Sequence, residues 1–223
     1  TIGRYFEEVS EDYEDFSLGF DGRLEIGLYS QATASFSHEG GHEGRDSPDD
    51  VGGAVPSIFF KTTSKLAGRY VADLFEVRAS FKDERLNFRD NAEFDNDDRD
   101  RDEIFFTLRG SYEFTPGTAV FIEPRANWII YDDQIDNEGF ERDNNGYKIS
   151  AGLTIDTGGV TFLEFLFGFL SQSQDDPQLD GLDDFFGELK GTWNPTDLTT
   201  VNVRFKREIR QTTSIDSPFE LQD

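Results

Sequence analysis

Apolar and polar residues alternate with a period of two along most of the chain. The segments 103–114, 119–130 and 199–210 place apolar side chains at every second position and mainly charged or polar ones between them. Successive side chains of a strand point to opposite faces, so this period indicates strands with one apolar and one polar face. A helix would need apolar spacings of three and four, which these segments lack.

Other segments fit the strand pattern less cleanly. The segments 16–26 and 75–82 also gather their apolar residues on one face. The run 160–170 is apolar on both faces except at Glu164 and Gly168, as a short buried helix would be. The Gly158-Gly159 turn signal before it favours a strand. Together the segments predict about eleven strands of roughly 10–14 residues.

Two kinds of connection alternate between these strands. Tight-turn signals occur at Thr115–Thr118, Thr157–Gly159 and Asn194–Asp197, with weaker candidates at Gly27–Gln31 and Ala67–Tyr70. Gly, Pro and Asn supply the backbone angles that tight turns require. The intervening connections are long. The sequence therefore predicts an all-β fold, an antiparallel up-and-down meander with short turns on one side and long loops on the other.

The long connections carry the net charge of the protein. Windows 7–15, 39–50, 88–103, 132–143 and 175–184 hold 30 of the 46 acidic residues and five of the 21 basic ones. They account for the entire formal charge of −25, and the rest of the chain is neutral. The chain is thus predicted to be a neutral β-body with an acidic rim. The lack of a basic surface argues against nucleic acid as a partner.

Strand length and loop asymmetry favour a transmembrane β-barrel. A tilted strand needs about 9–11 residues to cross a bilayer, and outer-membrane barrels have short turns on one side and long loops on the other. Aromatic residues near strand ends suit the membrane interfaces; they are Tyr5, Tyr112, Trp128, Tyr131, Tyr147 and Trp193. Pro124, on the apolar face of its strand, is an oddity because Pro cannot donate to the ladder. A soluble β-sandwich or barrel is the alternative, since period two alone does not separate the two.

Composition narrows the remaining classes. The chain has no Cys, which excludes disulfides and thiolate metal sites, and its aromatic content of 14% argues against simple disorder. No apolar run approaches the length of a transmembrane helix, and no signal peptide is visible. The chain also lacks Met, so we expect it to be a processed or partial piece of a longer exported protein.

Metal-binding signals are weak. His38 and His42 are the only histidines, and we place them at a strand end running into a Gly-rich loop. The acidic run at 95–103 does not fit an EF-hand, because a loop read from Asp98 has Glu103 at its sixth position where Gly is required. We therefore predict no cofactor. Weak divalent-cation binding by the acidic loops is left open, as is sharing of such ions with lipopolysaccharide phosphates.

The sequence gives no enzymatic signature. It contains no nucleophile elbow, phosphate-binding loop or zinc motif. Pairs of carboxylates occur by chance among 46 acidic residues and do not by themselves indicate a glycosidase. We predict that the protein is not an enzyme.

The polar faces of the strands hold the most useful candidates. In a barrel, nine charged residues would point inward and line a pore: Arg109, Glu113, Glu123, Arg125, Glu164, Glu188, Lys190, Arg204 and Lys206. They could set ion or sugar selectivity, as charged rings do in channels. Alternatively, they pair across strands and plug a narrow lumen.

An ordered set of loop and turn motifs resembles a known family. The motifs are Asp12-Tyr13-Glu14-Asp15, Ser47-Pro48-Asp49-Asp50-Val51-Gly52-Gly53, the run 96–103, Tyr112–Thr118, Gly158–Phe162 and Thr192–Thr196. They resemble the type-2 outer-membrane β-barrel porins of alphaproteobacteria and their relatives, in order and over nearly the whole chain. The resemblance implies a barrel in the bacterial outer membrane, associated by context with exopolysaccharide production, and no catalytic residues.

Two functional hypotheses follow for residues 1–223, taken as a single β-barrel domain. The first is a passive pore, or a barrel accessory to exopolysaccharide export. The second is a non-conducting surface scaffold whose acidic loops contact ions, sugars or other chains. Family chains look longer, and single-chain bacterial barrels have even strand numbers. We therefore expect further strands, a second copy or a partner chain to complete the sheet, with outer-membrane lipid and lipopolysaccharide around it.

Overall fold

The protein is built around one antiparallel meander. The structure, a computed structural model, describes the backbone of residues 2–3, 13–43, 57–90, 96–196, 198–211 and 219–222. Its main sheet has 11 strands in the order β13-β12-β11-β10-β9-β8-β7-β6-β5-β4-β3. Each strand therefore pairs with its neighbours in sequence, which confirms the predicted fold class and strand number.

Ten long strands of 11–15 residues form most of this sheet. They are β3 (Phe16–Ile26), β4 (Ser30–His42), β5 (Ile58–Ala72), β6 (Phe75–Phe88), β7 (Arg101–Thr115), β8 (Thr118–Tyr131), β9 (Asn144–Asp156), β10 (Thr161–Gln174), β11 (Leu182–Thr196) and β12 (Thr199–Gln211). The short strand β13 (Phe219–Gln222) pairs with β12, while β1 (Ile2–Gly3) and β2 (Tyr13–Glu14) form a separate pair. A 3-10 turn, η2 (Asp97–Arg99), precedes β7.

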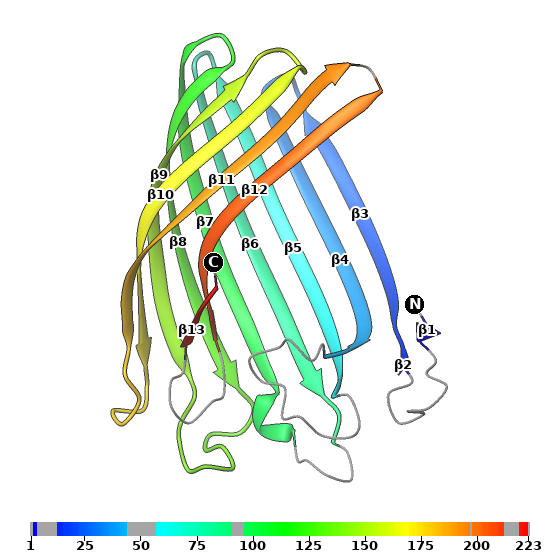
Figure 1. Cartoon of the computed structure of the whole chain (residues 1–223), viewed down its shortest axis with the longest axis vertical. Helices are drawn as coiled ribbons and strands as arrows, with labels where there is room; N and C mark the ends of the chain where they lie inside the picture. The colour runs from blue at the N-terminus through cyan, green and yellow to red at the C-terminus, as the bar shows by residue number, and fades with distance from the viewer. Residues whose placement is uncertain are drawn as a thin grey trace.

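Short turns join the strands at one end of the sheet, drawn at the top of Figure 1. In the β7–β8 turn Thr115 pairs with Thr118, and Gly117 adopts a φ of 77°, as the sequence predicts. The predicted turn at Ala67–Tyr70 is wrong, because those residues lie inside β5 and the chain reverses after Ala72. Asp73 takes a φ of 53° there, a left-handed conformation that Asp tolerates better than most residues.

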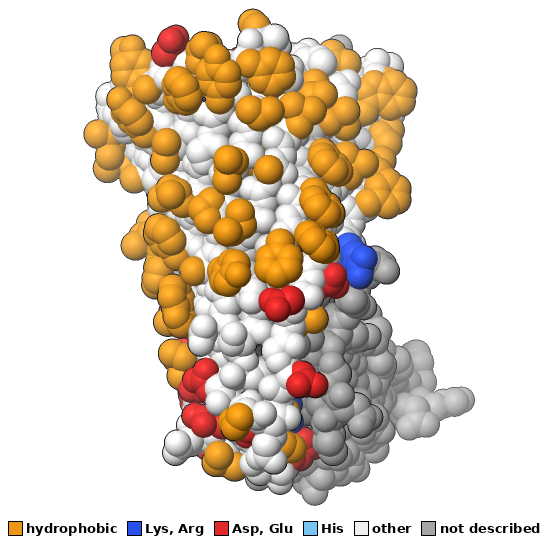
Figure 2. Space-filling view, turned by 90° about the vertical axis from the view of Figure 1, so that its left-hand side faces the viewer, with side chains coloured by type: hydrophobic (Ala, Val, Ile, Leu, Met, Phe, Trp, Pro, Cys, Tyr) orange, Lys and Arg blue, Asp and Glu red, His pale blue; other side chains and the backbone are white. Residues whose placement is uncertain are grey.

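The long connections gather at the opposite end, at the bottom of Figure 1. The windows 132–143 and 175–184 include the β8–β9 and β10–β11 loops, and the window 88–103 includes η2. Most of the red acidic side chains visible in Figure 2 lie in the lower half of the molecule, toward this end. The acidic windows with described residues thus lie at a single rim, whereas the motif Ser47–Gly53 falls outside the described residues.

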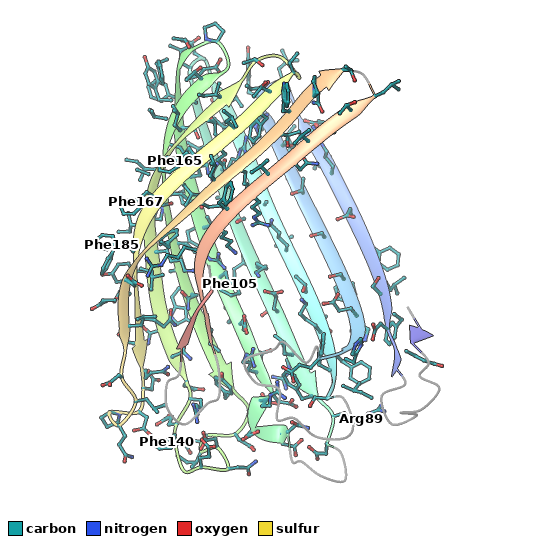
Figure 3. All side chains as sticks on the ribbon, in the orientation of Figure 1. Arg89, Phe105, Phe140, Phe165, Phe167 and Phe185 are labelled. Atoms are coloured by element: carbon teal, nitrogen blue, oxygen red, sulfur yellow. The ribbon has the colours of Figure 1, made fainter. Side chains whose placement is uncertain are left out.

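The outer face of the sheet is apolar. Phe165, Phe167 and Phe185 project outward in Figure 3, and each residue is more than half exposed. Hydrophobic side chains cover much of the face in Figure 2, except near the acidic end. The exposed positions alternate with less exposed ones along β7 and β8, as the period-two pattern predicts. A surface of this kind is suited to contact with lipid.

Only some of the aromatic residues that we assigned to the membrane interfaces lie where the sequence predicts. Tyr112, Trp128, Tyr147 and Trp193 are exposed on the outer face. Tyr131, in contrast, is buried on the inner side beside Arg101, so its assignment to an interface is wrong. Its position is one step out of phase with Trp128 and Ile130 on the same strand. Tyr5 lies outside the described residues.

Apart from Val160, the run 160–170 lies in strand β10, which resolves the ambiguity between helix and strand. Its outward residues are exposed, while Leu166 and Leu170 are buried on the inner face. Nearby, the ring of Phe121 occupies the space that a side chain at Gly152 would need. The inner wall of β8–β10 therefore contains a small apolar core, in agreement with a run that is apolar on both faces.

Pro124 interrupts the ladder between β7 and β8. Paired positions run to Thr107 and Arg125 and resume only at Gly110 and Ile122. Pro has no N–H to donate, so a gap in the ladder is the expected consequence. The gap includes Arg109 and Glu123, two of the predicted inward residues.

The curled sheet is not closed. Among the described residues, β3 and β13 form its two edges and do not pair with each other. Figure 1 shows the strands tilted and wrapped into a partial cylinder. In the part of the chain that is described, we find no helix that is both long and apolar enough to span a membrane.

Candidate functional site

The concave wall of the sheet brings the nine predicted residues together. Three hollows of about 620, 330 and 280 Å³ lie along it, and each of the nine residues lines at least one of them. The residues come from β7 (Arg109, Glu113), β8 (Glu123, Arg125), β10 (Glu164), β11 (Glu188, Lys190) and β12 (Arg204, Lys206). The inward assignment from period two therefore agrees with the structure; their role in a pore remains a prediction.

Six of these residues form a continuous chain of ion pairs. The contacts run in order through Glu123, Arg109, Glu164, Lys190, Glu188 and Arg204, with N–O distances of 2.5, 2.7, 3.3, 3.1 and 2.6 Å. The chain crosses from β8 and β7 to β12 over the concave face. Charges in a partly desolvated wall need such partners, because an uncompensated buried charge is costly.

Arg109 is the centre of the wall. Its Nε lies 2.5 Å from Glu123 and its Nη1 lies 2.7 Å from Glu164, while its guanidinium stacks on the ring of Phe121 at 3.9 Å. A planar guanidinium with two carboxylates and a ring beneath it is held in one orientation. Arg109 also lines all three hollows, so it is the one side chain that the three share.

The other three predicted residues are Glu113, Arg125 and Lys206. Glu113 accepts a hydrogen bond of 2.9 Å from the backbone N–H of Gly117, and so supports the β7–β8 turn. The guanidinium of Arg125 lies 4.3 Å from the centre of the Phe105 ring, which also carries the ammonium of Lys82 at 4.2 Å. Lys206 lines the 280 Å³ hollow beside Arg125.

Sequence reasoning missed several residues on the same wall. Arg69, Arg78 and Arg109 occupy directly paired positions on β5, β6 and β7, and so form a row of three arginines. Glu76 offsets part of this charge, because it pairs with both Arg69 and Arg78. The alternation of 75–82 already places Arg78 on the face opposite the apolar one. That the three arginines lie side by side depends on the register between strands, which the sequence does not give.

Buried arginines organise the acidic rim. Arg99, with 5% of its side chain exposed, donates to both carboxylate oxygens of Glu43 at 2.7 and 2.8 Å and lies over Phe88. Arg142 pairs with Asp136 at 2.5 Å. Burial would raise the pKa of Asp136, but hydrogen bonds from the Phe140 N–H and from Arg142 lower it. The loops are therefore structured by charge pairs and are more than solvated acidic segments.

The histidines do not form a metal site with other described residues. Contrary to the expected Gly-rich loop, Gly40 and Gly41 belong to β4, which continues to His42. His38 stacks against Phe60 and bonds to Thr62, and His42 contacts Asp15 at 2.9 Å. Among the described residues, no group with the spacing of metal ligands includes a histidine.

Three rim carboxylates lie close enough together to share a cation. They belong to Glu141, Asp143 and Asp175, and their ligand oxygens lie within 4.8 Å of one another. One Asp143 oxygen already accepts the backbone N–H of Tyr131 at 2.7 Å. Ca²⁺ takes six to eight oxygen ligands, so three carboxylates are a partial set.

Comparison with known proteins agrees with this architecture. The model of the family described as "Putative beta-barrel porin 2" matches residues 1–221. A solved structure described as "Outer-membrane expressed OmpT of Vibrio cholerae" has a similar fold, with a TM-score of 0.57 and 11% sequence identity. The alignment covers 92% of this chain and 60% of that protein's chain. That likeness concerns the fold alone, and the chain spans 60% of that protein's length. A search of the curated proteins finds no match.

The family match covers nearly the whole chain and confirms the family predicted from the turn and loop motifs. The apolar outer face, the asymmetric loops and the similar fold agree with it. The chain belongs to the beta-barrel porin 2 family and is a β-barrel protein of the bacterial outer membrane.

Proposed function

We propose that this protein lines a passive, water-filled path across the outer membrane. The observation that carries the proposal is the contrast between an apolar outer face and a charged concave wall that keeps three hollows around Arg109. Larger β-barrels with polar interiors form aqueous channels. The proposed activity is transport without catalysis, in agreement with the family.

The orientation of the barrel follows the usual asymmetry of outer-membrane proteins. Their short turns face the periplasm and their long loops face the exterior. We place the acidic loops at 132–143 and 175–181 on the cell surface. There they are surrounded by lipopolysaccharide, whose phosphates can share divalent cations with the loop carboxylates.

Single-channel recording in planar bilayers tests the path. Ser80 lines the 620 Å³ hollow, whereas Val77 on the same strand is exposed on the apolar outer face. The wild-type protein is expected to give a steady ion current that Ser80→Trp lowers and Val77→Trp leaves unchanged. A protein that inserts fully but carries no current would overturn the proposal.

A non-conducting scaffold is the second candidate. The chain of ion pairs across the concave face favours it, because paired charges can narrow a lumen. Absence of current together with oligomers on native gels would support this role. An accessory role in exopolysaccharide export rests on the resemblance of the loop motifs, and a deletion strain that secretes normal amounts of polymer would argue against it.

A further inference from the structure

The short turns of the barrel share an unexpected feature, an exposed apolar residue. The five turns join β3 to β4, β5 to β6, β7 to β8, β9 to β10 and β11 to β12 at one end of the sheet (Figure 1). Their exposed apolar residues are Leu28, Leu74, Pro116, Val160 and Leu198. Leu28 and Leu198 are the extremes, at 91% and 97% exposed. One such residue would need no explanation, but one in every short turn indicates a contact at this end.

Two belts of aromatic residues mark the membrane interfaces on the outer face. Toward the short turns, Tyr70, Tyr112 and Trp193 are exposed and lie two or three residues before the ends of β5, β7 and β11. Toward the acidic rim, Trp128 and Tyr147 are exposed and lie three residues from the ends of β8 and β9. Tyr and Trp gather at the boundary between lipid headgroups and hydrocarbon. The belts therefore give the height of the membrane on the barrel.

The two belts lie closer together than the lipid-facing band of an outer-membrane barrel is tall. Trp128 is paired with Ile104, which lies eight residues before Tyr112 on β7. At about 3.4 Å per residue and a tilt of about 35–45°, this separation is about 19–22 Å along the membrane normal. The apolar band of such barrels is about 25 Å tall. The hydrocarbon is thus expected to extend about 3–6 Å beyond one of the two belts.

Charged residues prevent this extension on the rim side. Asp102 lies an even number of positions from Phe106 and so shares its outer face. It forms an ion pair with Arg85 at 3.3 Å and is paired with Ile130, two residues beyond Trp128. Charged side chains that face hydrocarbon are unfavourable. The hydrocarbon therefore ends near Trp128 on this side.

The outer face stays apolar beyond the belt on the turn side. Phe75 and Phe114 are 60% and 49% exposed next to the turns, and orange side chains continue to this end in Figure 2. Trp193 lies three residues before the end of β11, about 7–8 Å along the membrane normal. The headgroup layer beyond the hydrocarbon is about 5–8 Å thick in each leaflet. If the hydrocarbon extends past Trp193, the turns fall within this layer.

We propose that the short turns are seated in the headgroup layer of the lipid leaflet on their side of the membrane, with Leu28 and Leu198 as apolar anchors. In the orientation given above, this leaflet faces the periplasm. Lipid is the partner because the turns continue the lipid-facing outer face and are spread over five hairpins around a curved end (Figure 1). The proposal requires the outer-membrane location but no conducting path, and so it goes beyond the proposed function.

The two tryptophans of the chain, Trp128 and Trp193, provide the first test. Trp128→Phe leaves the tryptophan near the turns, and Trp193→Phe leaves the one near the rim, so each variant is the matched control of the other. In vesicles of phosphatidylcholine brominated in the middle of the acyl chain, we expect stronger fluorescence quenching of Trp193 than of Trp128. Equal quenching, or stronger quenching of Trp128, would overturn the proposal.

Spin labels test the turns themselves, and the absence of Cys from the chain makes single labels simple. Leu28→Cys and Leu198→Cys place a nitroxide on two turns, and Ile135→Cys is the control on the β8–β9 loop, where Ile135 is 53% exposed. Circular dichroism and heat-modifiable migration confirm that each labelled variant folds. In phosphatidylcholine vesicles, oxygen should reach both turn labels, whereas a water-soluble nickel chelate should reach them far less than it reaches the control.

Two results of the labelling would overturn the proposal. Nickel access at both turns equal to that at Ile135 would place the turns in water. Labels shielded from both oxygen and nickel would indicate a protein neighbour, such as a second copy of the chain, in place of lipid. Neither readout needs an ion current, so a failure of the proposed path leaves this test unaffected.

Discussion

Arg109 on β7 and Glu164 on β10 form an ion pair of 2.7 Å although β8 and β9 lie between their strands. Neighbouring strands are about 4.8 Å apart, so in a flat sheet these two strands would be separated by about 14 Å. The contact therefore depends on the curvature of the sheet. It ties together two parts of the wall that backbone hydrogen bonds connect only through intervening strands.

Glu164→Gln is expected to destabilise the barrel. The side chain of Glu164 is 10% exposed and contacts both Arg109 and Lys190, so its neutralisation leaves two cations with less compensation. We expect the free energy of unfolding to fall by about 2 kcal/mol. Urea-induced unfolding in lipid vesicles, followed by tryptophan fluorescence, measures the change.

Glu25→Gln provides the control for that substitution. It makes the same chemical change in the Arg23–Glu25 pair, where both side chains are more than half exposed. Exposed pairs contribute about 0–1 kcal/mol, so this variant should unfold nearly as the wild type does. Equal losses in the two variants would show that the pair between β7 and β10 has no special role.

Much of the fold could be predicted from the sequence because the period of two is local information. The alternation at 103–114 and 119–130 assigns each side chain to a face before any strand is paired. Gly117 marks its turn because a φ of 77° is unfavourable for other residues. The nine inward residues follow from the same alternation, and their places on the wall agree with it.

The remaining features depend on register and curvature, which local patterns do not contain. The row formed by Arg69, Arg78 and Arg109 exists only because three strands pair at those positions. The contact between Arg109 and Glu164 requires a curled sheet as well. The turn at Asp73 was misplaced because Gly68 looks like a turn residue, although it pairs with Ala32 and Ala79 inside the sheet.

Phe167→Arg tests whether the outer face contacts lipid. Phe167 is 54% exposed in the middle of β10 and stacks against Phe185 on the same face. An arginine facing lipid near the bilayer midplane costs about 2–4 kcal/mol. We expect a loss of this size in unfolding experiments in vesicles. Thr33→Arg, which places the same charge on the hollow side of β4, should cost much less. Equal costs at both positions would contradict the assignment of faces.

Two glycines with similar backbone angles should respond differently to substitution. Gly117 and Gly158 have φ values of 77° and 74°, so Ala is strained at both. At Gly158 a Cβ meets nothing within 4 Å, and we expect a loss of about 1–2 kcal/mol. At Gly117 a Cβ would overlap the carbonyl oxygen of Asp156, so Gly117→Ala should cost clearly more. Thermal unfolding of both variants measures the difference, and a larger effect at Gly158 would refute this view of the β7–β8 turn.

The rim loops should lose their structure in acid. Hydrogen bonds from Arg85 lower the pKa of Asp132, and hydrogen bonds from the backbone N–H groups of Gln178 and Glu141 lower the pKa of Asp176. The pKa of Asp136 is lowered as well, despite its burial. A carboxyl group whose folded pKa is lowered stabilises the fold above its unfolded pKa, and this contribution disappears as the pH falls through the folded value.

Hydrogen exchange followed by mass spectrometry can measure this transition in peptides that cover 132–143 and 175–181. Protection should be constant from neutral pH to about pH 4 and should fall below it, because the ordinary pKa of Asp is 3.8. Asp136→Asn removes the charge that pairs with Arg142, so its loop should exchange faster already at neutral pH and depend less on acid. Protection that persists well below about pH 3 in the wild type would show that these carboxylates do not hold the rim together.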